Sequence, residues 1–265
     1  LPRLPDRETF RITEAGRRAL PQLAQRSIAA RLLAALELNG AMSRRELRTV
    51  SASALKQLPD MLEKGWLAVE QEALNLKMAA GPELLEEQRQ AVETVTQAFG
   101  GFAPFLLHGV TGSGKTEVYL RLIEQALERG GQALLLVPEI ALTPQLEARV
   151  SNRFQGARLV SLHSSLADGA RAAGFLQALN GEADIVLGTR LSVFTPLPRL
   201  AAIVVDEEHD ASYKQQEGAR YSARDLAVWR GRNEGVPVLL GSATPSLETW
   251  QQAELGRYAR LALPG

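Results

Sequence analysis

One stretch of eight residues has the composition and spacing of a phosphate-binding loop. The sequence GVTGSGKT, residues 109–116, fits the pattern G-x-x-x-x-G-K-[ST] in full. An apolar segment precedes it and a helical pattern follows, which is the setting that such a loop requires. Its glycines let the backbone curl until successive N–H groups point at phosphate oxygens, and the positive end of the following helix adds to the attraction. We therefore expect ATP to be bound by Gly109, Thr111, Gly112, Ser113, Gly114, Lys115 and Thr116.

A second polar cluster, DEEH at residues 206–209, follows the buried apolar run 202–205. Lys115 is expected to reach the β- and γ-phosphates, while Thr116 and Asp206 hold Mg²⁺, the carboxylate through water because this small ion keeps its hydration shell. Glu207 is the candidate for orienting or deprotonating the attacking water. His209 is expected to contact the γ-phosphate or to couple the site to its surroundings. The alternatives are a solvated acidic turn and a histidine that satisfies a backbone carbonyl.

The segments that must position these clusters are short, apolar and separated by helix-length stretches. Strands are expected at residues 105–108, 133–137, 159–162, 185–187, 203–205 and 238–240. This alternation is typical of a mostly parallel sheet with helices on both faces, an α/β fold of the RecA-like P-loop NTPase kind. Ligands of such sheets bind at the carboxyl ends of the strands, so both clusters are expected at one edge.

The first eighty residues follow a different pattern. We expect a strand at 10–13, helices at 27–39, after Ser43 and at 53–64, and a two-stranded wing at 66–78. Helix, turn, helix and wing indicate a small winged-helix (α+β) domain over residues 1–80, followed by an ATP-binding domain over residues 81–265. Within the winged-helix domain, the candidates for contacting DNA phosphates are Arg44, Arg45 and Arg48. A small helical bundle that only docks onto a protein is the alternative.

Composition narrows the class of protein. The net charge is zero, although residues 1–80 carry 13 Lys+Arg against 9 Asp+Glu and the remainder 17 against 21, so no global field draws the chain onto nucleic acid. The absence of cysteine excludes disulfides and thiolate metal sites within this chain. Neither a membrane-spanning run nor a signal-peptide layout is present, and we expect a cytoplasmic protein without a membrane partner.

Six stretches together resemble the superfamily 2 helicases, and more closely the bacterial replication-restart helicases. They are GVTGSGKTEVY (109–119), VPEIALTPQ (137–145), LHSSL (162–166), GTR (188–190), DEEHDASYKQQEGARYSARDLAVWR (206–230) and GSATPS (241–246). The resemblance covers the chain from about residue 84 onward and the first eighty residues only loosely.

The resemblance assigns roles to further residues. Gln88 matches the glutamine that reads adenine, although Leu85 stands where the pattern has asparagine. Arg190, with the segment around Glu139, would contact phosphates of single-stranded DNA without sequence preference. The remaining DNA-binding or coupling candidates are Tyr213, Arg220, Tyr221, Ser242 and Thr244.

The resemblance implies that two of these groups couple DNA binding to ATP hydrolysis. The aromatic-rich segment 213–229 would stack on unpaired bases, with Ala219 standing where an aromatic residue is expected. Ser242 and Thr244 would link hydrolysis to strand movement by bonding to the acidic cluster.

The resemblance also implies a function for a longer parent protein. It would be an ATP-dependent 3′→5′ DNA helicase, active as a monomer on branched and single-stranded DNA at stalled or abandoned replication forks. Its partners would be primosome proteins, single-stranded-DNA-binding protein and a helicase loader, and the parent would hold zinc. We expect this chain to be a fragment that is poorly active without the arginines of a second lobe. The alternatives are another superfamily 2 translocase and a non-enzymatic docking fragment.

Overall fold

The computed structural model describes residues 8–71, 77–79 and 81–264. The chain forms two compact units, one within residues 4–73 and one within residues 74–265. No helix among the described residues is long and apolar enough to cross a membrane.

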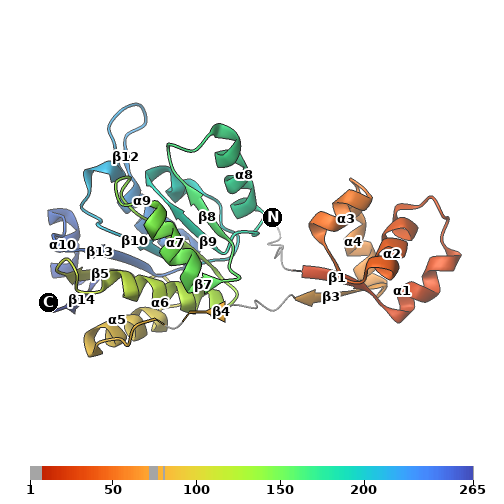
Figure 1. Ribbon diagram of the computed structural model, residues 1–265, viewed down its shortest axis with the longest axis horizontal. Helices are drawn as coiled ribbons and strands as arrows, with labels where there is room; N and C mark the ends of the chain where they lie inside the picture. The colour runs from red at the N-terminus through yellow and green to blue at the C-terminus, as the bar shows by residue number, and fades with distance from the viewer. Residues whose placement is uncertain (1–7, 72–76, 80, 265) are drawn as a thin grey trace. The chain divides into compact units, whose positions relative to one another are not determined.

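The first unit packs helices against a small antiparallel sheet (Figure 1). Its elements are β1 (Glu8–Ile12), α1 (Glu14–Ala19), η1 (Leu20–Gln22), α2 (Ile28–Asn39), β2 (Met42–Ser43), α3 (Arg44–Val50), α4 (Ala54–Glu63) and β3 (Leu67–Gln71). Ser43 and Glu46 form the capping box expected at the start of α3. Pro59 lies inside α4, whose helical course continues past it. Phe10, Leu33 and Met61 are among the side chains that fill the core.

Within the segment expected to form a two-stranded wing, residues 66–78, the described strands pair with partners outside that segment. Strand β3 pairs with β1, which precedes all the helices, whereas β4 (Lys77–Met78) belongs to the second unit and pairs there with β7 (Phe154–Gln155). Residues 72–76, which fall within the expected wing, lie outside the described residues. The pairing partners are distant in the chain, which a local pattern of residues cannot reveal. The winged-helix assignment is therefore not confirmed.

The second unit is built on a seven-stranded sheet in which every neighbouring pair is parallel, in the order β14-β5-β13-β10-β6-β9-β8. The strands are β5 (Pro104–Gly109), β6 (Gln132–Leu136), β8 (Leu159–Leu162), β9 (Ile185–Gly188), β10 (Leu200–Val205), β13 (Val238–Ser242) and β14 (Ala259–Leu263). All six strands expected from the sequence are present. The seventh, β14, lies at the sheet edge.

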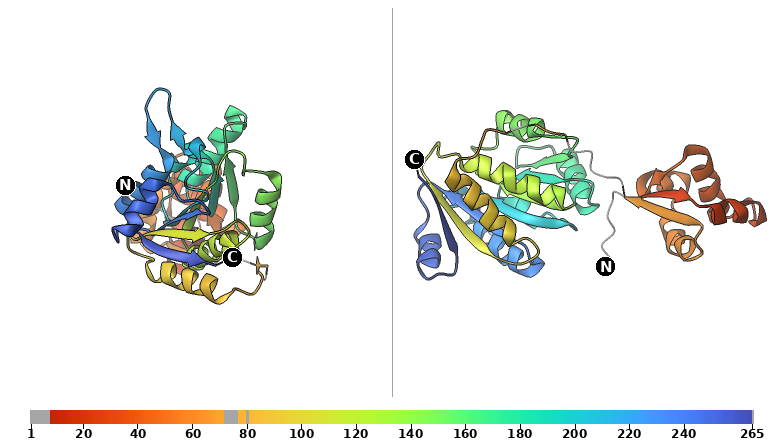
Figure 2. Two further views of the ribbon diagram at one scale, coloured as in Figure 1. Left: turned by 90° about the vertical axis from the view of Figure 1, so that its left-hand side faces the viewer. Right: turned by 90° about the horizontal axis from the view of Figure 1, so that it is seen from below.

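Helices cover both faces of this sheet (Figures 1 and 2). They are α5 (Glu86–Gln97), α6 (Lys115–Glu128), α7 (Pro144–Arg153), α8 (Asp168–Leu179), α9 (Ala223–Glu234) and α10 (Leu247–Glu254). Alternate strand residues enter two separate cores: Leu135 packs with α5, α6 and α7 on one face, and Leu134 with α8 and α9 on the other. The RecA-like α/β fold is confirmed.

A short hairpin leaves the sheet between β10 and α9. Its parts are η3 (Ala211–Tyr213), β11 (Lys214–Gln215) and β12 (Tyr221–Ser222), and Figure 1 and the left view of Figure 2 show it standing clear of the sheet. Residues 216–220 at its tip are exposed. The hairpin and the first turns of α9 together contain the aromatic-rich segment 213–229 of the sequence.

Candidate active site

The phosphate-binding loop runs from the end of β5 into α6. Gly112 and Gly114 have φ values of 87° and 85°, a left-handed conformation that favours glycine. A Cβ atom added at Gly114 would lie 2.2 Å from the Gln88 amide nitrogen. The sequence pattern is therefore required by the shape of the loop.

Lys115 places a buried ammonium group at this loop. The residue is 7% exposed, and its Nζ donates to the carbonyl oxygens of Gly109 at 2.8 Å and Val110 at 3.3 Å. Glu207 Oε1 lies 3.9 Å from the same nitrogen. A cation held by two carbonyls can exchange them for phosphate oxygens without a change of fold.

Asp206 is held by hydroxyl and backbone donors. The Tyr119 hydroxyl, from α6, donates to its Oδ1 at 2.9 Å, and the Glu207 N–H to the same atom at 3.0 Å. Burial raises the pKa of Asp206 above its ordinary value, against the opposing effect of the Tyr119 hydrogen bond. The pKa of the Tyr119 hydroxyl is raised well above its ordinary value, mainly by burial and then by the Asp206 charge.

Glu207 has an unusual backbone. Among the described residues it is the only non-glycine with a positive φ, 43°. A left-handed backbone at a non-glycine residue costs energy and recurs at functional sites. This conformation directs the Glu207 carboxylate toward Lys115 on one side and His209 Nδ1, 3.6 Å away, on the other.

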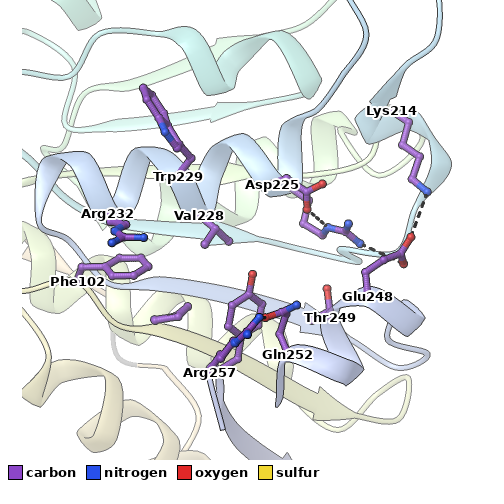
Figure 3. A pocket seen from close by; sticks show the side chains of 13 residues that line it. Phe102, Lys214, Asp225, Val228, Trp229, Arg232, Glu248, Thr249, Gln252 and Arg257 are labelled. Atoms are coloured by element: carbon purple, nitrogen blue, oxygen red, sulfur yellow. Dashed lines mark hydrogen bonds and ion pairs between the residues drawn. The ribbon is translucent and has the colours of Figure 1, made fainter. Parts of the chain in front are cut away.

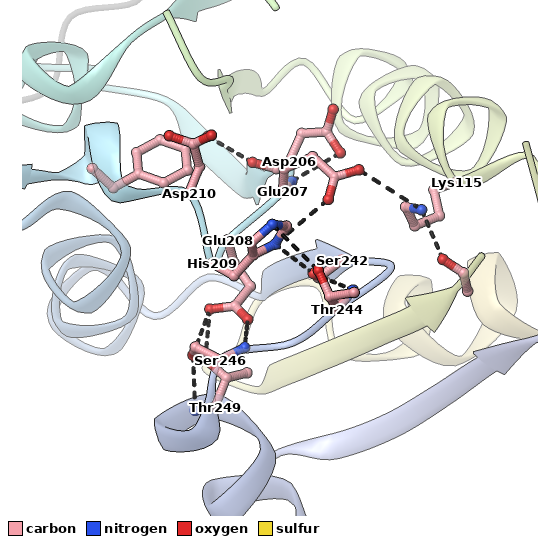
Figure 4. Close-up of polar contacts among 12 residues, drawn as sticks. Lys115, Asp206, Glu207, Glu208, His209, Asp210, Ser242, Thr244, Ser246 and Thr249 are labelled. Atoms are coloured by element: carbon pink, nitrogen blue, oxygen red, sulfur yellow. Dashed lines mark hydrogen bonds and ion pairs between the residues drawn. The ribbon is translucent and has the colours of Figure 1, made fainter. Parts of the chain in front are cut away.

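His209 joins the acidic cluster to the Ser-Ala-Thr segment after β13. Its Nδ1 lies 2.8 Å from Ser242 Oγ and its Nε2 3.3 Å from Thr244 Oγ1 (Figure 4). The two hydroxyls thus contact the histidine, where the sequence had suggested contacts with the carboxylates. The order of strands explains why His209 contacts Ser242 and Thr244. The Ser-Ala-Thr segment follows β13, which lies directly beside β10, the strand that leads to His209.

These groups fit Mg-ATP. The Ser113 hydroxyl is buried at the loop without a hydrogen-bond partner in the described structure, and Lys115 offers a positive charge beside it. The described residues contain no cluster of three or more His, Cys, Asp or Glu that could hold a metal on its own. Magnesium carried by a nucleotide needs only one or two protein oxygens, which Thr116 and Asp206 can supply.

Comparison with known proteins agrees with this geometry. Residues 85–253 match the family described as DEAD/DEAH box helicase. The chain belongs to the DEAD/DEAH box helicase family.

Curated relatives of this helicase chain carry the name replication restart protein PriA. Identity is 44% over 182 residues with the Bacillus subtilis protein, 46% over 212 with that of Synechocystis sp., and 50% over 163 with that of Haemophilus influenzae. The alignments cover 68%, 77% and 62% of this chain but 22%, 25% and 22% of the relatives. The resemblance to replication-restart helicases is confirmed, and the chain spans about a quarter of the length of these relatives.

One solved structure, described as RecG bound to a three-way DNA junction, is similar at 16% identity with a TM-score of 0.49. It covers 92% of this chain and 38% of the other. A likeness this distant supports no inference about function.

In this helicase chain Gln88 contacts the phosphate-binding loop itself. Its Nε2 donates to the Ser113 carbonyl at 2.9 Å, and its Oε1 accepts the Leu85 N–H at 3.0 Å. The side chain therefore braces the loop from α5. Its reading of adenine stays a prediction.

Of the residues predicted to contact DNA, Tyr213 is buried, whereas Arg220 is exposed and Tyr221 is half-buried. Tyr213 is 1% exposed and donates its hydroxyl to the Asp206 carbonyl at 2.7 Å, so its ring is not presented to unpaired bases and the stacking role predicted for it does not fit. Arg190 Nη1 donates to the carbonyls of Ser212 and Lys214, each at 3.2 Å. Arg220 is exposed on the hairpin, and half-buried Tyr221 meets Phe194 edge-on at 5.2 Å.

Arg44 and Arg48 lie in the first unit. Arg44 packs over the Phe10 ring at 5.0 Å, and Arg48 is exposed on α3. The side chain of Arg45 lies outside the described part of the structure.

Sequence reasoning missed Tyr119, Glu208 and Arg224. Each of them contacts a residue that is not its neighbour in the sequence. Tyr119 and Asp206, for example, are 87 positions apart. One sequence signal was available: Glu208 in DEEH is an additional acidic residue to which nucleotide binding and hydrolysis assign no role.

Proposed function

We propose that this chain is the ATP-binding motor lobe of an ATP-dependent DNA helicase that acts at stalled or abandoned replication forks. The observation that carries the proposal is the approach of Lys115 Nζ to Glu207 Oε1, 3.9 Å apart, at the carboxyl edge of the parallel sheet. The names of the relatives, replication restart protein PriA, support the biological setting.

Each residue of the site has a proposed part in hydrolysis. Bound Mg-ATP supplies the phosphoanhydride bond and the ion that neutralises its charge. Lys115 and the N–H groups of residues 109–116 hold the phosphates, while Thr116 and Asp206 orient the ion through their oxygens. Glu207 positions water and accepts its proton, and His209 carries the state of this carboxylate to Ser242 and Thr244.

Single-stranded and branched DNA are the proposed partners. Arg190 lies at the carboxyl end of β9, next in the sheet to β6, whose end leads to Glu139. Arg220 and Tyr221 on the hairpin add a charge and a ring, a combination that suits binding without sequence preference.

The wider setting rests on the family resemblance. We propose 3′→5′ polarity, a cytoplasmic monomer, and contacts with primosome proteins, single-stranded-DNA-binding protein and a helicase loader. Zinc is assigned to other parts of the whole protein, because this chain contains no cysteine. Arginines from a second lobe would complete the hydrolytic site.

A different superfamily 2 translocase is disfavoured by the hairpin sequence SYKQQEG, residues 212–218. The first unit either binds DNA or docks onto a protein, and replacing Arg44, Arg45 and Arg48 distinguishes the two roles. Phosphate contacts release counterions, so DNA binding through these arginines would weaken steeply with added salt and fall when they are replaced.

Nucleotide binding by this chain tests the proposal at its first step. Titration with a fluorescent ATP analogue and Mg²⁺ should show Lys115→Ala binding at least about tenfold more weakly than wild type, because one charge-assisted contact is removed. The control is Lys64→Ala, which removes an exposed lysine paired with Asp60 on α4. Equal affinity of wild type and Lys115→Ala would contradict the proposal.

A further inference from the structure

Glu208 is the most enclosed residue of the acidic cluster, although it faces no nucleotide-binding group. The residue is 2% exposed, whereas its neighbours Asp206 and Glu207 are half-buried. Burying a carboxylate is costly unless hydrogen bonds replace its water. Its partners therefore indicate what the burial achieves.

The Glu208 carboxylate bonds to two different helices. From the start of α10, the Ser246 N–H donates to Oε1 at 2.7 Å, and the hydroxyls of Ser246 and Thr249 donate to Oε2 at 3.0 and 2.8 Å (Figure 4). From the first turn of α9, Arg224 Nη1 donates to Oε2 at 3.2 Å. One side chain thus joins the ends of the Ser-Ala-Thr segment and of the hairpin.

Both ends of the hairpin are tied to the acidic cluster. Tyr213, at its entry, donates its hydroxyl to the Asp206 carbonyl. Arg224, two residues beyond its last strand, bonds to Glu208. Between these ties lies the exposed tip, residues 216–220, which has no comparable anchor among the hydrogen bonds described.

Besides its bonds to Asp225 and Ser246, Arg224 has an exposed acidic neighbour on α10 that serves as a comparison with Glu208. Glu248 lies 3.9 Å from Arg224 and 4.0 Å from Lys214, beside a cavity of about 650 Å³ between α9 and α10 (Figure 3). Its side chain is 62% exposed. Solvent weakens such a pair, so Glu248 holds Arg224 far less than buried Glu208 does.

We propose that Glu208 is the positioning residue that ties the DNA-facing hairpin to the nucleotide site. The inference rests on the proposed function and names the link within it. Glu208 follows Glu207 directly, so a shift of the strained Glu207 backbone when nucleotide binds moves the Glu208 carboxylate. Arg224 and Ser246 follow it, because their hydrogen bonds are made to that carboxylate.

Hydrogen–deuterium exchange of this chain tests the proposal, with and without Mg²⁺ and a non-hydrolysable ATP analogue. In wild type the analogue should slow exchange in residues 109–116 and also in residues 214–222. Glu208→Gln should keep the first effect and lose the second by about fivefold or more, since amide exchange reports local opening. The matched control, Glu248→Gln, should behave as wild type. Arg224→Gln removes the bond to Glu208 on the hairpin side, together with the Arg224 bonds to Ser246 and Asp225, and should reproduce the loss if Glu208→Gln fails to fold.

The outcomes separate the two hypotheses. No slowing at residues 109–116 in wild type would contradict the proposed function. With that slowing present, retained slowing at residues 214–222 in Glu208→Gln and in Arg224→Gln would overturn the role of Glu208. Loss of both effects in a folded Glu208→Gln would overturn it too, because Glu208 would then support the nucleotide site itself.

Discussion

At the scale of single residues, Asp206 is fixed by two tyrosines that belong to the cores on opposite faces of the sheet. Tyr119 donates to its carboxylate and Tyr213 to its backbone carbonyl. Gly241 leaves room for this arrangement, since a Cβ there would lie 1.7 Å from the Tyr119 hydroxyl. The carboxylate is therefore oriented before any ligand arrives.

Tyr119→Phe should lower the free energy of unfolding by roughly 1.5–3 kcal/mol, because it removes a buried hydrogen bond to a charged group. Urea denaturation of this chain provides the measurement. Tyr258→Phe, a change at a half-buried tyrosine, should stay within about 0.5 kcal/mol of wild type. Equal effects of the two changes would show that the Tyr119 hydroxyl contributes nothing specific.

Asp206→Asn should make the ligand-free chain more stable at neutral pH. Burial raises the pKa of Asp206, so this group stabilises the fold below its unfolded pKa, and that contribution is lost as pH rises through the folded pKa. The advantage of the variant should accordingly be larger at about pH 8 than at about pH 5, reaching a few degrees in Tm. Thermal melts without Mg²⁺ measure it. A variant less stable than wild type at about pH 8 would contradict the expectation.

Residue types and spacing were enough to predict Lys115, Asp206 and Glu207 from the sequence, because phosphate and magnesium chemistry restricts which groups can serve. Nothing local indicated that Tyr213 is buried, since an aromatic residue in a polar loop can face either way. Glu208 was unassigned for a related reason: its donors lie on two helices later in the chain.

At the scale of elements, α6 and α7 are joined by a buried network of ion pairs. Arg153 Nη2 lies 3.1 Å from Glu117 Oε1 and 3.4 Å from Glu124 Oε2, with Arg153 and Glu117 each less than a tenth exposed. This network supports the helix that begins at the phosphate-binding loop. Removing one member would leave buried charge uncompensated.

Arg153→Ala should therefore destabilise the second unit by roughly 3–5 kcal/mol. Arg149→Ala removes an exposed arginine from the same helix and should change stability by less than about 0.5 kcal/mol. Chemical denaturation followed by circular dichroism compares the two. A cost below about 1 kcal/mol for Arg153→Ala would mean that the ion pairs are not needed for packing.

Elements were predicted well wherever a short apolar run marks a strand, including β8 at one edge of the sheet. The six apolar segments stood out by composition. Strand β14 did not, because its residues Ala259, Arg260 and Ala262 are exposed. The wing is not confirmed, since the described strand β3 pairs with β1, and pairing between distant segments leaves no local pattern.

At the scale of the whole molecule, the parallel sheet brings the segments proposed to bind nucleotide and those proposed to bind DNA to one edge. Strands β5, β13 and β10 carry the phosphate-binding loop, the Ser-Ala-Thr segment and the acidic cluster, while β6, β9 and β8 lead to the segments around Glu139, Arg190 and residues 163–166. The hairpin after β10 lies in the chain between the acidic cluster and the Ser-Ala-Thr segment. A motor that couples hydrolysis to movement along DNA requires both groups on one rigid support.

The central claim is that this site hydrolyses ATP and that DNA stimulates the hydrolysis. We would measure hydrolysis by the whole protein, with and without forked DNA, in wild type, Lys115→Ala, Glu207→Gln and the exposed control Glu254→Gln. The account predicts DNA-stimulated hydrolysis in wild type and the control, and a loss of about a hundredfold or more in the other two, since each removes a group that acts on the transferred phosphate or the attacking water. Hydrolysis that is unaffected by DNA, or folded Lys115→Ala and Glu207→Gln variants that hydrolyse ATP normally, would contradict it.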